Sequence, residues 1–101
     1  MIIYNISFTI APSFLEEWQH WSKEFLIPTI MDSKYFDSYK KLKVLTQEAN
    51  QYPIYCLQFS TDSIYRYTQY DTELSESIKK QVSDKYKDQV LFFDSILKEI
   101  D

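Results

Sequence analysis

The sequence predicts an α+β fold in which two helices cover one face of a four-stranded antiparallel sheet. Two segments repeat apolar residues with the period of a helix, and four shorter segments read as strands. Their order along the 101 residues is strand, helix, strand, strand, helix, strand. This β-α-β-β-α-β order is that of the ferredoxin-like, or split βαβ, fold. We therefore expect a single ferredoxin-like domain over residues 1–101.

The first strand is predicted at Ile2–Ile10, where apolar and polar side chains alternate. One face of this strand is apolar and is expected to pack beneath the helices: Ile2, Tyr4, Ile6, Phe8 and Ile10. The other face is mixed and includes Asn5 and Ser7. This alternation predicts a sheet with one apolar face and one mixed face.

The first helix is predicted over Pro12–Met31, and the rest of the chain can be placed around it. Its apolar stripe has steps of four, three and four residues, through Phe14, Trp18, Trp21 and Phe25. Such a stripe packs on a sheet, so we expect both tryptophans in the core rather than stacked on a ligand. Ser13 and Glu16 fit a capping box. Pro28 is expected to end or kink the helix because it lacks a backbone N–H.

The second strand is predicted over Tyr35–Gln47. The residues expected to face the helices are Phe36, Leu42 and Val44. The middle of this strand is basic, with Lys40, Lys41 and Lys43. Lysines on a strand can bind an anion, but they also prevent edge-to-edge pairing of sheets, and we favour the edge-strand interpretation.

The second half of the chain supplies two more strands and a helical region. Pro53–Ser60 is the third strand, with Tyr55, Leu57 and Phe59 toward the helices. The helical region follows as one helix, or as two with a break near residues 71–72, and its apolar stripe is Ile64, Tyr67, Leu74, Ile78, Val82 and Tyr86. Val90–Ile100 is the last strand, and two competing alternations leave open which of its faces points inward.

The sheet face away from the helices is mixed in character. It is expected to carry Ile3, Asn5, Ser7, Thr9, Ile54, Cys56, Gln58 and Ser60, together with Phe92, Asp94 and Ile96 under one alternation of the last strand. This face is too apolar at its ends for open solvent. We expect two subunits to bring these faces together and close a shared α+β barrel. The alternative is a monomer in which this face of the sheet is partly exposed to solvent.

Four polar residues of this face form the candidate ligand-binding site: Asn5, Ser7, Gln58 and Asp94. They would project from three strands into the barrel interior. A few convergent polar groups among apolar walls suit a small-molecule pocket. The alternative is that they only form hydrogen bonds across the dimer interface.

The composition excludes several classes of function. The chain has no glycine, so the glycine-rich loops that hold phosphates or dinucleotides are ruled out. The net charge of −4 has the wrong sign for a nucleic-acid partner. One cysteine, Cys56, and one histidine, His20, compose neither a metal site nor a catalytic triad, so we expect no metal and no cofactor and assign no catalytic residue.

The sequence also bears on location. Its first residues lack the basic region and the small-residue cleavage site of a signal peptide, and no apolar run has the length of a membrane span. We therefore expect a soluble, cytoplasmic protein without a membrane partner.

Several features recur together along the whole chain: the opening Met1-Ile2-Ile3-Tyr4-Asn5, the pair Trp18 and Trp21, Ile27-Pro28, Val44-Leu45, Tyr55 with Gln58, and the segment from Tyr86 to Phe93. With these features the chain resembles a family of small bacterial proteins recorded only as a domain of unknown function. The resemblance implies a ferredoxin-like fold, similar to the dimeric α+β barrel proteins, and no established activity. Relatives often have histidine in place of Leu26, a polar residue near Val82 and arginine near Asp94, so this member lacks any site that those groups serve.

Two hypotheses for function follow. The first is a homodimeric, cytoplasmic small-molecule-binding or interaction module that works without a cofactor. The alternative is a cofactor-free oxygenase or isomerase of the α+β barrel type, in which Asn5 and Asp94 polarise an enolisable substrate; it rests on fold analogy. This alternative requires both residues on one face of the sheet. Whether the protein is an enzyme stays open, and the sequence favours a protein that is not.

Overall fold

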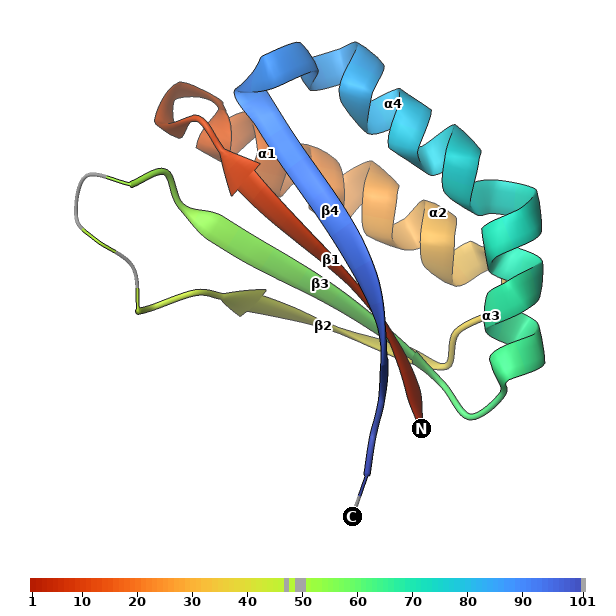
Figure 1. The fold of residues 1–101 in the computed structure, drawn as a ribbon. Coiled ribbons are helices and arrows are strands. Elements are labelled where there is room, and N and C mark those ends of the chain that lie inside the picture. The colour runs from red at the N-terminus through yellow and green to blue at the C-terminus, as the bar shows by residue number, and fades with distance from the viewer. Residues whose placement is uncertain (47, 49–50, 101) are drawn as a thin grey trace.

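The computed structural model describes residues 1–46, 48 and 51–100 and shows one sheet with helices packed on a single face (Figure 1). The strands are β1 (Ile2–Ile10), β2 (Ser38–Lys43), β3 (Ile54–Thr61) and β4 (Val90–Lys98). The helices are α1 (Leu15–Trp21), α2 (Ile27–Asp32), α3 (Ile64–Tyr70) and α4 (Glu76–Tyr86). The sheet order is β2-β3-β1-β4 and every neighbouring pair is antiparallel. The predicted ferredoxin-like fold is confirmed.

The central strand β1 divides the sheet into the two predicted faces. Residues that lie opposite each other on paired strands share a face. On the helix side β1 and β3 pair as Tyr4–Phe59, Ile6–Leu57 and Phe8–Tyr55. We call the other side the open face; its pairs from these two strands are Ile3–Ser60, Asn5–Gln58, Ser7–Cys56 and Thr9–Ile54. The alternation in β1 and β3 therefore predicts both faces correctly.

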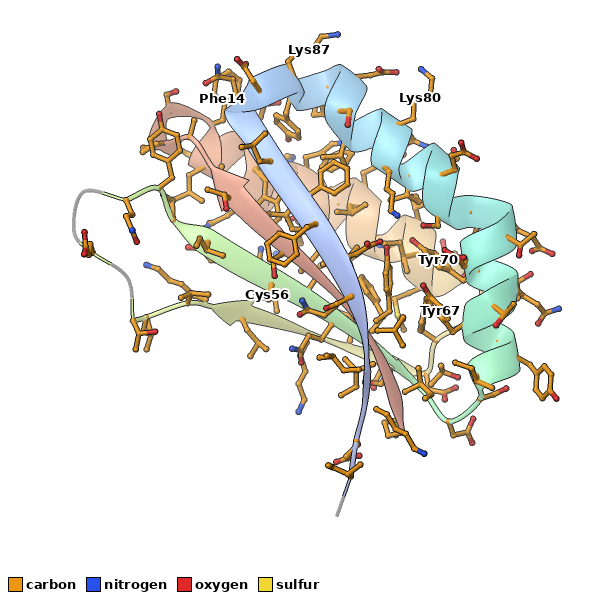
Figure 2. The ribbon with its side chains drawn as sticks, viewed as in Figure 1. Phe14, Cys56, Tyr67, Tyr70, Lys80 and Lys87 are labelled. Atoms are coloured by element: carbon orange, nitrogen blue, oxygen red, sulfur yellow. The ribbon has the colours of Figure 1, made fainter. Side chains whose placement is uncertain are left out.

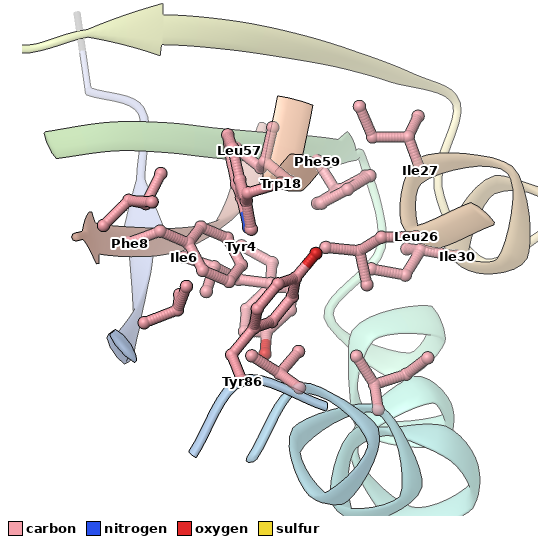
Figure 3. Close-up of a cluster of buried hydrophobic side chains, with 14 of the residues drawn as sticks. Tyr4, Ile6, Phe8, Trp18, Leu26, Ile27, Ile30, Leu57, Phe59 and Tyr86 are labelled. Atoms are coloured by element: carbon pink, nitrogen blue, oxygen red, sulfur yellow. The ribbon is translucent and has the colours of Figure 1, made fainter. Parts of the chain in front are cut away.

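The layer between sheet and helices is filled mainly by aromatic and branched side chains (Figure 3). Trp18 is fully buried, with its ring 5.0 Å from that of Phe8 and 5.6 Å from that of Tyr55. Trp21 is half-buried and meets the Tyr86 ring edge-on at 5.6 Å. Both tryptophans thus belong to the packing, as predicted, and aromatic pairs of this kind contribute about 0.5–1.5 kcal/mol each beyond the area that they bury.

The first helical segment contains a π-helical turn at Ser22–Leu26, between α1 and α2. A π turn holds more residues than an α turn and rotates the stripe that follows it. The fully buried positions therefore recur at steps of four, at Trp18, Ser22, Leu26 and Ile30. Phe25 is 42% exposed, so its predicted place on the buried stripe is wrong.

The ends of this first segment differ from the prediction. A 3-10 turn at Pro12–Phe14 precedes α1, and no side chain caps either helical start, so the capping box expected from Ser13 and Glu16 does not form. Pro28 does not end the helix, which continues to Asp32. It lies in the first turn of α2, directly after the π turn, where a missing backbone N–H costs least.

The second helical segment has its own π-helical turn at Asp71–Ser75, where the sequence predicts an interruption. The helix therefore changes its winding at this point and continues into α4. Ile78, Val82 and Tyr86 are buried as predicted. Tyr70 is also fully buried, although it lies off the predicted stripe.

The second strand is shorter than predicted, and all six residues of β2 are exposed. Phe36 is buried, but it lies before the strand. Leu42 lies opposite Cys56 and so faces away from the helices, which makes its predicted orientation wrong. The predicted end of this strand at Gln47 lies outside the described residues. β2 does lie at the edge of the sheet, as its lysines predict.

The register of β4 decides between the two alternations of the last strand. Val90, Phe92, Asp94 and Ile96 lie opposite Ile10, Phe8, Ile6 and Tyr4, and so face the helices. The open face receives Leu91, Phe93, Ser95 and Leu97. The placement of Phe92, Asp94 and Ile96 on the open face is therefore wrong. The strand starts with Val90 in the core at 1% exposure, and this anchor fixes the parity of every residue after it.

Two of the described residues have a positive φ, and in a chain without glycine both are lysines. Lys34 ends α2 with φ 68°, and its N–H donates to the Met31 carbonyl at 3.1 Å. Lys87 follows α4 with φ 55° and ψ −129°. Both positions have the left-handed backbone that helix ends usually assign to glycine.

Candidate functional site

A chain of polar side chains crosses the middle of the open face. The Asn5 side-chain amide donates to the Ser7 hydroxyl at 3.2 Å, and the Gln58 amide donates to the Asn5 carbonyl oxygen at 3.2 Å. The Ser7 hydroxyl also lies 3.4 Å from the Cys56 sulfur. Three of the four predicted site residues, Asn5, Ser7 and Gln58, are thus brought together, and Cys56 joins them. We call these four residues the polar cluster.

The polar cluster is more enclosed than its position on a sheet surface implies. Asn5 is only 9% exposed and Ser7 only 8%, even in a single chain. Apolar side chains flank the cluster on the outer strands, and they remain exposed: Leu42 at 42%, Leu91 at 61%, Phe93 at 67% and Leu97 at 42%. Phe93 lies directly opposite Ser7, and Leu42 lies directly opposite Cys56. The open face therefore has a polar centre with an apolar border on β4, whereas on β2 the apolar Leu42 stands beside Lys40, which lies opposite Gln58.

A shallow hollow lies at one end of the open face, next to the polar cluster. Its volume is about 370 Å³, and it is lined by Thr9, Gln51, Tyr52 and Ile54. Thr9 and Ile54 are each two residues along their strands from Ser7 and Cys56.

Asp94 does not belong to the polar cluster, because it lies on the helix side of the sheet. Its carboxylate accepts a hydrogen bond from the Tyr4 hydroxyl at 2.7 Å and forms an ion pair with the Lys79 ammonium of α4 at 3.0 Å. The predicted convergence of Asp94 with Asn5 is therefore wrong. The reason is the parity of β4, which the sequence left open.

The Tyr4–Asp94–Lys79 contacts determine the charge states on the helix side. Burial raises the pKa of Tyr4, as do Tyr70 and the Asp94 carboxylate, so this phenol stays protonated and donates. Partial burial opposes the ionisation of Asp94, but the Tyr4 hydroxyl and the Lys79 ammonium together lower its pKa below the ordinary value. The sequence carried a signal for this contact, since a tyrosine on a buried strand face needs a partner for its hydroxyl.

A small cavity lies beside this ion pair, between β1, β4 and α4. It is lined by Tyr4, Ile6, Phe8, Ile78, Lys79, Val82 and Phe92, and its volume is about 10 Å³. One water molecule needs roughly 10–15 Å³ measured in this way. The cavity therefore has no room for a ligand, and the helix side of the sheet is a packed core.

The structure also places His20, the one histidine of the chain, and the tyrosines Tyr67 and Tyr70. His20 is exposed on α1, and Tyr67 and Tyr70 extend from α3 toward the sheet, while Cys56 projects from β3 (Figure 2). In residues 1–46, 48 and 51–100, no group of three or more His, Cys, Asp or Glu side chains could hold a metal ion. None of the described helices is long and apolar enough to cross a membrane.

Comparison with protein families gives one match over nearly the whole chain. Residues 1–100 match the family described as a domain of unknown function, DUF4286. The chain belongs to the DUF4286 family. This confirms the resemblance to a family of unknown function. The comparison of this DUF4286 protein with curated proteins gives no match.

Solved structures similar to this DUF4286 protein share its fold at low sequence identity. A dimeric ferredoxin-like protein from an uncultured marine organism has a TM-score of 0.71 and 12% identity, covering 100% of this chain and 96% of its own. An EthD family protein from Bacillus halodurans has a TM-score of 0.67 and 12% identity, covering 99% and 100%. A dimeric ferredoxin-like protein of unknown function from Jannaschia sp. has a TM-score of 0.57 and 11% identity, covering 98% and 100%. At these identities the likeness shows the fold alone.

At three positions the resemblance implies histidine, arginine or another polar residue in relatives, and all three lie in the layer between sheet and helices. Leu26 and Val82 are each 1% exposed within the core, and Asp94 is bonded to Tyr4. In this DUF4286 protein that layer is closed by apolar packing.

Proposed function

We propose that this DUF4286 protein is a homodimeric, cytoplasmic binding module that works without a cofactor and joins the open faces of two sheets. The observation that carries the proposal is the polar cluster on the open face beside an exposed apolar border on β4. Phe93 and Leu91 leave more than half of their surface in water at 67% and 61%. Two of the structural neighbours are described as dimeric, which supports the same assembly.

A second copy is the occupant that fits this face best. An interface between identical subunits is self-complementary, so a two-fold axis through the polar cluster would place the two clusters against each other and let the apolar side chains of β4 be covered by the partner. Fully burying a Leu or Phe side chain contributes about 1.5–3 kcal/mol, and covering the 42–67% of these side chains that is exposed contributes a corresponding part. Dimerisation also encloses the polar cluster of both subunits, which gives a small ligand a few oriented donors and acceptors among apolar walls.

The assembly is tested by light scattering after gel filtration at micromolar concentration. The wild-type protein should elute as a dimer, whereas Phe93→Glu should elute as a monomer, because it places a carboxylate in the apolar border. Tyr65→Glu is the matched control: Tyr65 is 80% exposed on α3, away from the open face, and its substitution should leave the dimer intact. A wild-type monomer, or dissociation by both variants alike, contradicts the proposal.

Ligand binding is tested separately, by NMR of the side-chain amides of Asn5 and Gln58. A library of small polar aromatic and carbonyl compounds is titrated into the labelled dimer. Compounds that bind the polar cluster should shift both amide signals, and Ser7→Ala should weaken binding by about fivefold through the loss of one hydrogen bond. If no compound shifts these signals while the dimer is intact, the cluster serves only the interface.

The oxygenase or isomerase alternative loses the residue pair on which it depended. Asn5 is on the open face and Asp94 on the helix side, so they cannot polarise one substrate together. No other described observation favours it, and we advance the binding module alone.

A further inference from the structure

The lysines of β2 divide between the two faces of the sheet, and this division separates two explanations for them. Lys40 lies opposite Gln58 on the open face. Lys41 and Lys43 lie opposite Leu57 and Tyr55, on the helix side. Protection of an exposed edge asks only for charge along the strand, on either face. It gives no reason for the helix-side lysines to converge on particular partners.

The helix-side lysines do converge, over two aromatic rings. The Lys41 ammonium lies 5.2 Å from the centre of the Trp18 ring and 6.0 Å from that of Tyr55. The Lys43 ammonium lies 6.0 Å from the centre of the same Tyr55 ring. Two ammonium groups therefore share one aromatic platform, although their like charges repel each other.

A third lysine approaches from the first helical segment. Lys23, in the π-helical turn, is close enough that its charge adds to the effect of burial in lowering the pKa of Lys41. Within the described part of the chain, Lys23, Lys41 and Lys43 form no ion pair with a carboxylate, whereas Arg66, Lys79, Lys80 and Lys85 each do. Two cations without a carboxylate partner thus lie over one aromatic platform, with the charge of Lys23 acting on Lys41, in a protein whose net charge is −4.

The Tyr55 hydroxyl adds a neutral hydrogen-bond donor to this region. The Tyr55 hydroxyl accepts a hydrogen bond from the Gln19 side-chain amide at 3.0 Å. Its acceptor role is thereby used, and its own proton remains available to a further acceptor. A phenol proton on a ring that two ammonium groups approach suits an oxyanion, which supplies several acceptor atoms and a negative charge.

We propose that Lys41, Lys43 and the Tyr55 hydroxyl form a binding site for a small phosphorylated ligand, with Lys23 contributing through its charge. This lysine site lies on the helix side of β2, so two subunits that join their open faces leave it accessible. A small ligand fits better than a nucleic acid or an anionic membrane, because the net negative charge of the protein repels a large polyanion. The proposal is independent of the polar cluster and of the dimer.

The test is calorimetric titration of the full chain with pyrophosphate and with inorganic phosphate, at an ionic strength held constant with sodium chloride. Wild-type protein should bind pyrophosphate, and Lys41→Gln should weaken that binding by about tenfold through the loss of one charged hydrogen bond. Lys43→Gln and Lys23→Gln should also weaken it, and Lys41→Arg should retain most of it. Lys40→Gln is the matched control from the same strand and should change the affinity by less than about twofold.

NMR locates the site independently of affinity. Pyrophosphate should shift the indole N–H signal of Trp18, beneath Lys41, and leave that of Trp21 unchanged. Equal losses in Lys40→Gln and Lys41→Gln would show unspecific charge attraction and overturn the proposal. Absence of pyrophosphate binding in the wild type would overturn it by itself, and aggregation of the lysine variants would then show that the lysines serve to protect the edge.

Discussion

The hydrogen bond from Tyr4 to Asp94 offers a direct test of how the last strand is positioned. Tyr4→Phe removes the hydroxyl and keeps the ring, which belongs to a residue that is 2% exposed and whose centre lies 5.2 Å or more from those of its aromatic neighbours. The ring contacts to Phe36, Phe59, Tyr67 and Tyr70 should therefore survive. The change isolates one bond, 2.7 Å long, between β1 and β4.

The expected loss of stability follows from the charge of the acceptor. A hydrogen bond to a charged group contributes about 1.5–3 kcal/mol net. Asp94 keeps its ion pair with Lys79 at 3.0 Å, so the lower half of that range applies, and we expect a loss of about 2 kcal/mol. For a domain of this size such a loss lowers the melting temperature by roughly 10 °C.

The dependence on pH has a defined sign. The pKa of Asp94 is lowered in the folded protein, so its contribution to stability is complete above the ordinary value of 3.8 and is lost as pH falls through the folded value. Tyr4→Phe removes one cause of the lowering, so the pKa of Asp94 should rise toward its ordinary value. Carboxyl carbon NMR measures that pKa in both proteins, and urea unfolding at neutral pH measures the free energy of unfolding.

A matched variant and a double-mutant cycle decide the outcome. Tyr39→Phe removes the hydroxyl of an exposed tyrosine on β2 and should cost less than about 0.5 kcal/mol. Tyr4→Phe and Asp94→Asn should be coupled by about 1 kcal/mol or more in the cycle. A coupling energy near zero, or an unchanged Asp94 pKa in Tyr4→Phe, would refute the assignment of Asp94 to the helix side.

Two further predictions concern the backbone and the buried phenols. Lys87→Gly should raise the free energy of unfolding by about 1 kcal/mol, because glycine adopts a positive φ without strain. Ser83→Gly, inside α4, is the control and should lower the free energy of unfolding by about 0.5–1 kcal/mol. Urea unfolding measures both changes. Burial raises the pKa of Tyr86 to about 12 and raises those of Tyr4 and Tyr70 further. The raised pKa values of these folded tyrosines stabilise the protein fully at pH values below 10.0, the ordinary pKa of a tyrosine. Above pH 10 the free energy of unfolding should fall, by up to about 4 kcal/mol per pH unit for three residues. A free energy of unfolding that does not change above pH 10 contradicts this prediction.

Strands with strict alternation were predictable from the sequence, and strands without it were not. β1 and β3 each place every second large apolar residue on one face, so both faces follow from the residues alone. In β4, Leu91, Phe93 and Leu97 match Phe92 and Ile96 in apolar character, so the pattern cannot choose. The choice comes from Val90, which the chain places in the core as it leaves α4.

The same difference between the strands explains which residues of the candidate site were predicted correctly. Asn5, Ser7 and Gln58 lie on the two strands with clear alternation, and they meet as predicted. Asp94 lies on the ambiguous strand and was assigned to the wrong face. The π-helical turns were likewise hidden, because a local change in winding alters no residue type; it moved the buried position from Phe25 to Leu26.

The position of β1 in the sheet has a consequence for biosynthesis. This strand precedes both of its neighbours in the chain, and its pairing with β4 extends from Ile10–Val90 to Ile2–Lys98. While the ribosome has yet to release residues 90–98, one long edge of an apolar strand stays unsatisfied and can recruit strands from other nascent chains. Termination of translation shortly before residue 90 should therefore yield aggregates rather than a partly folded monomer.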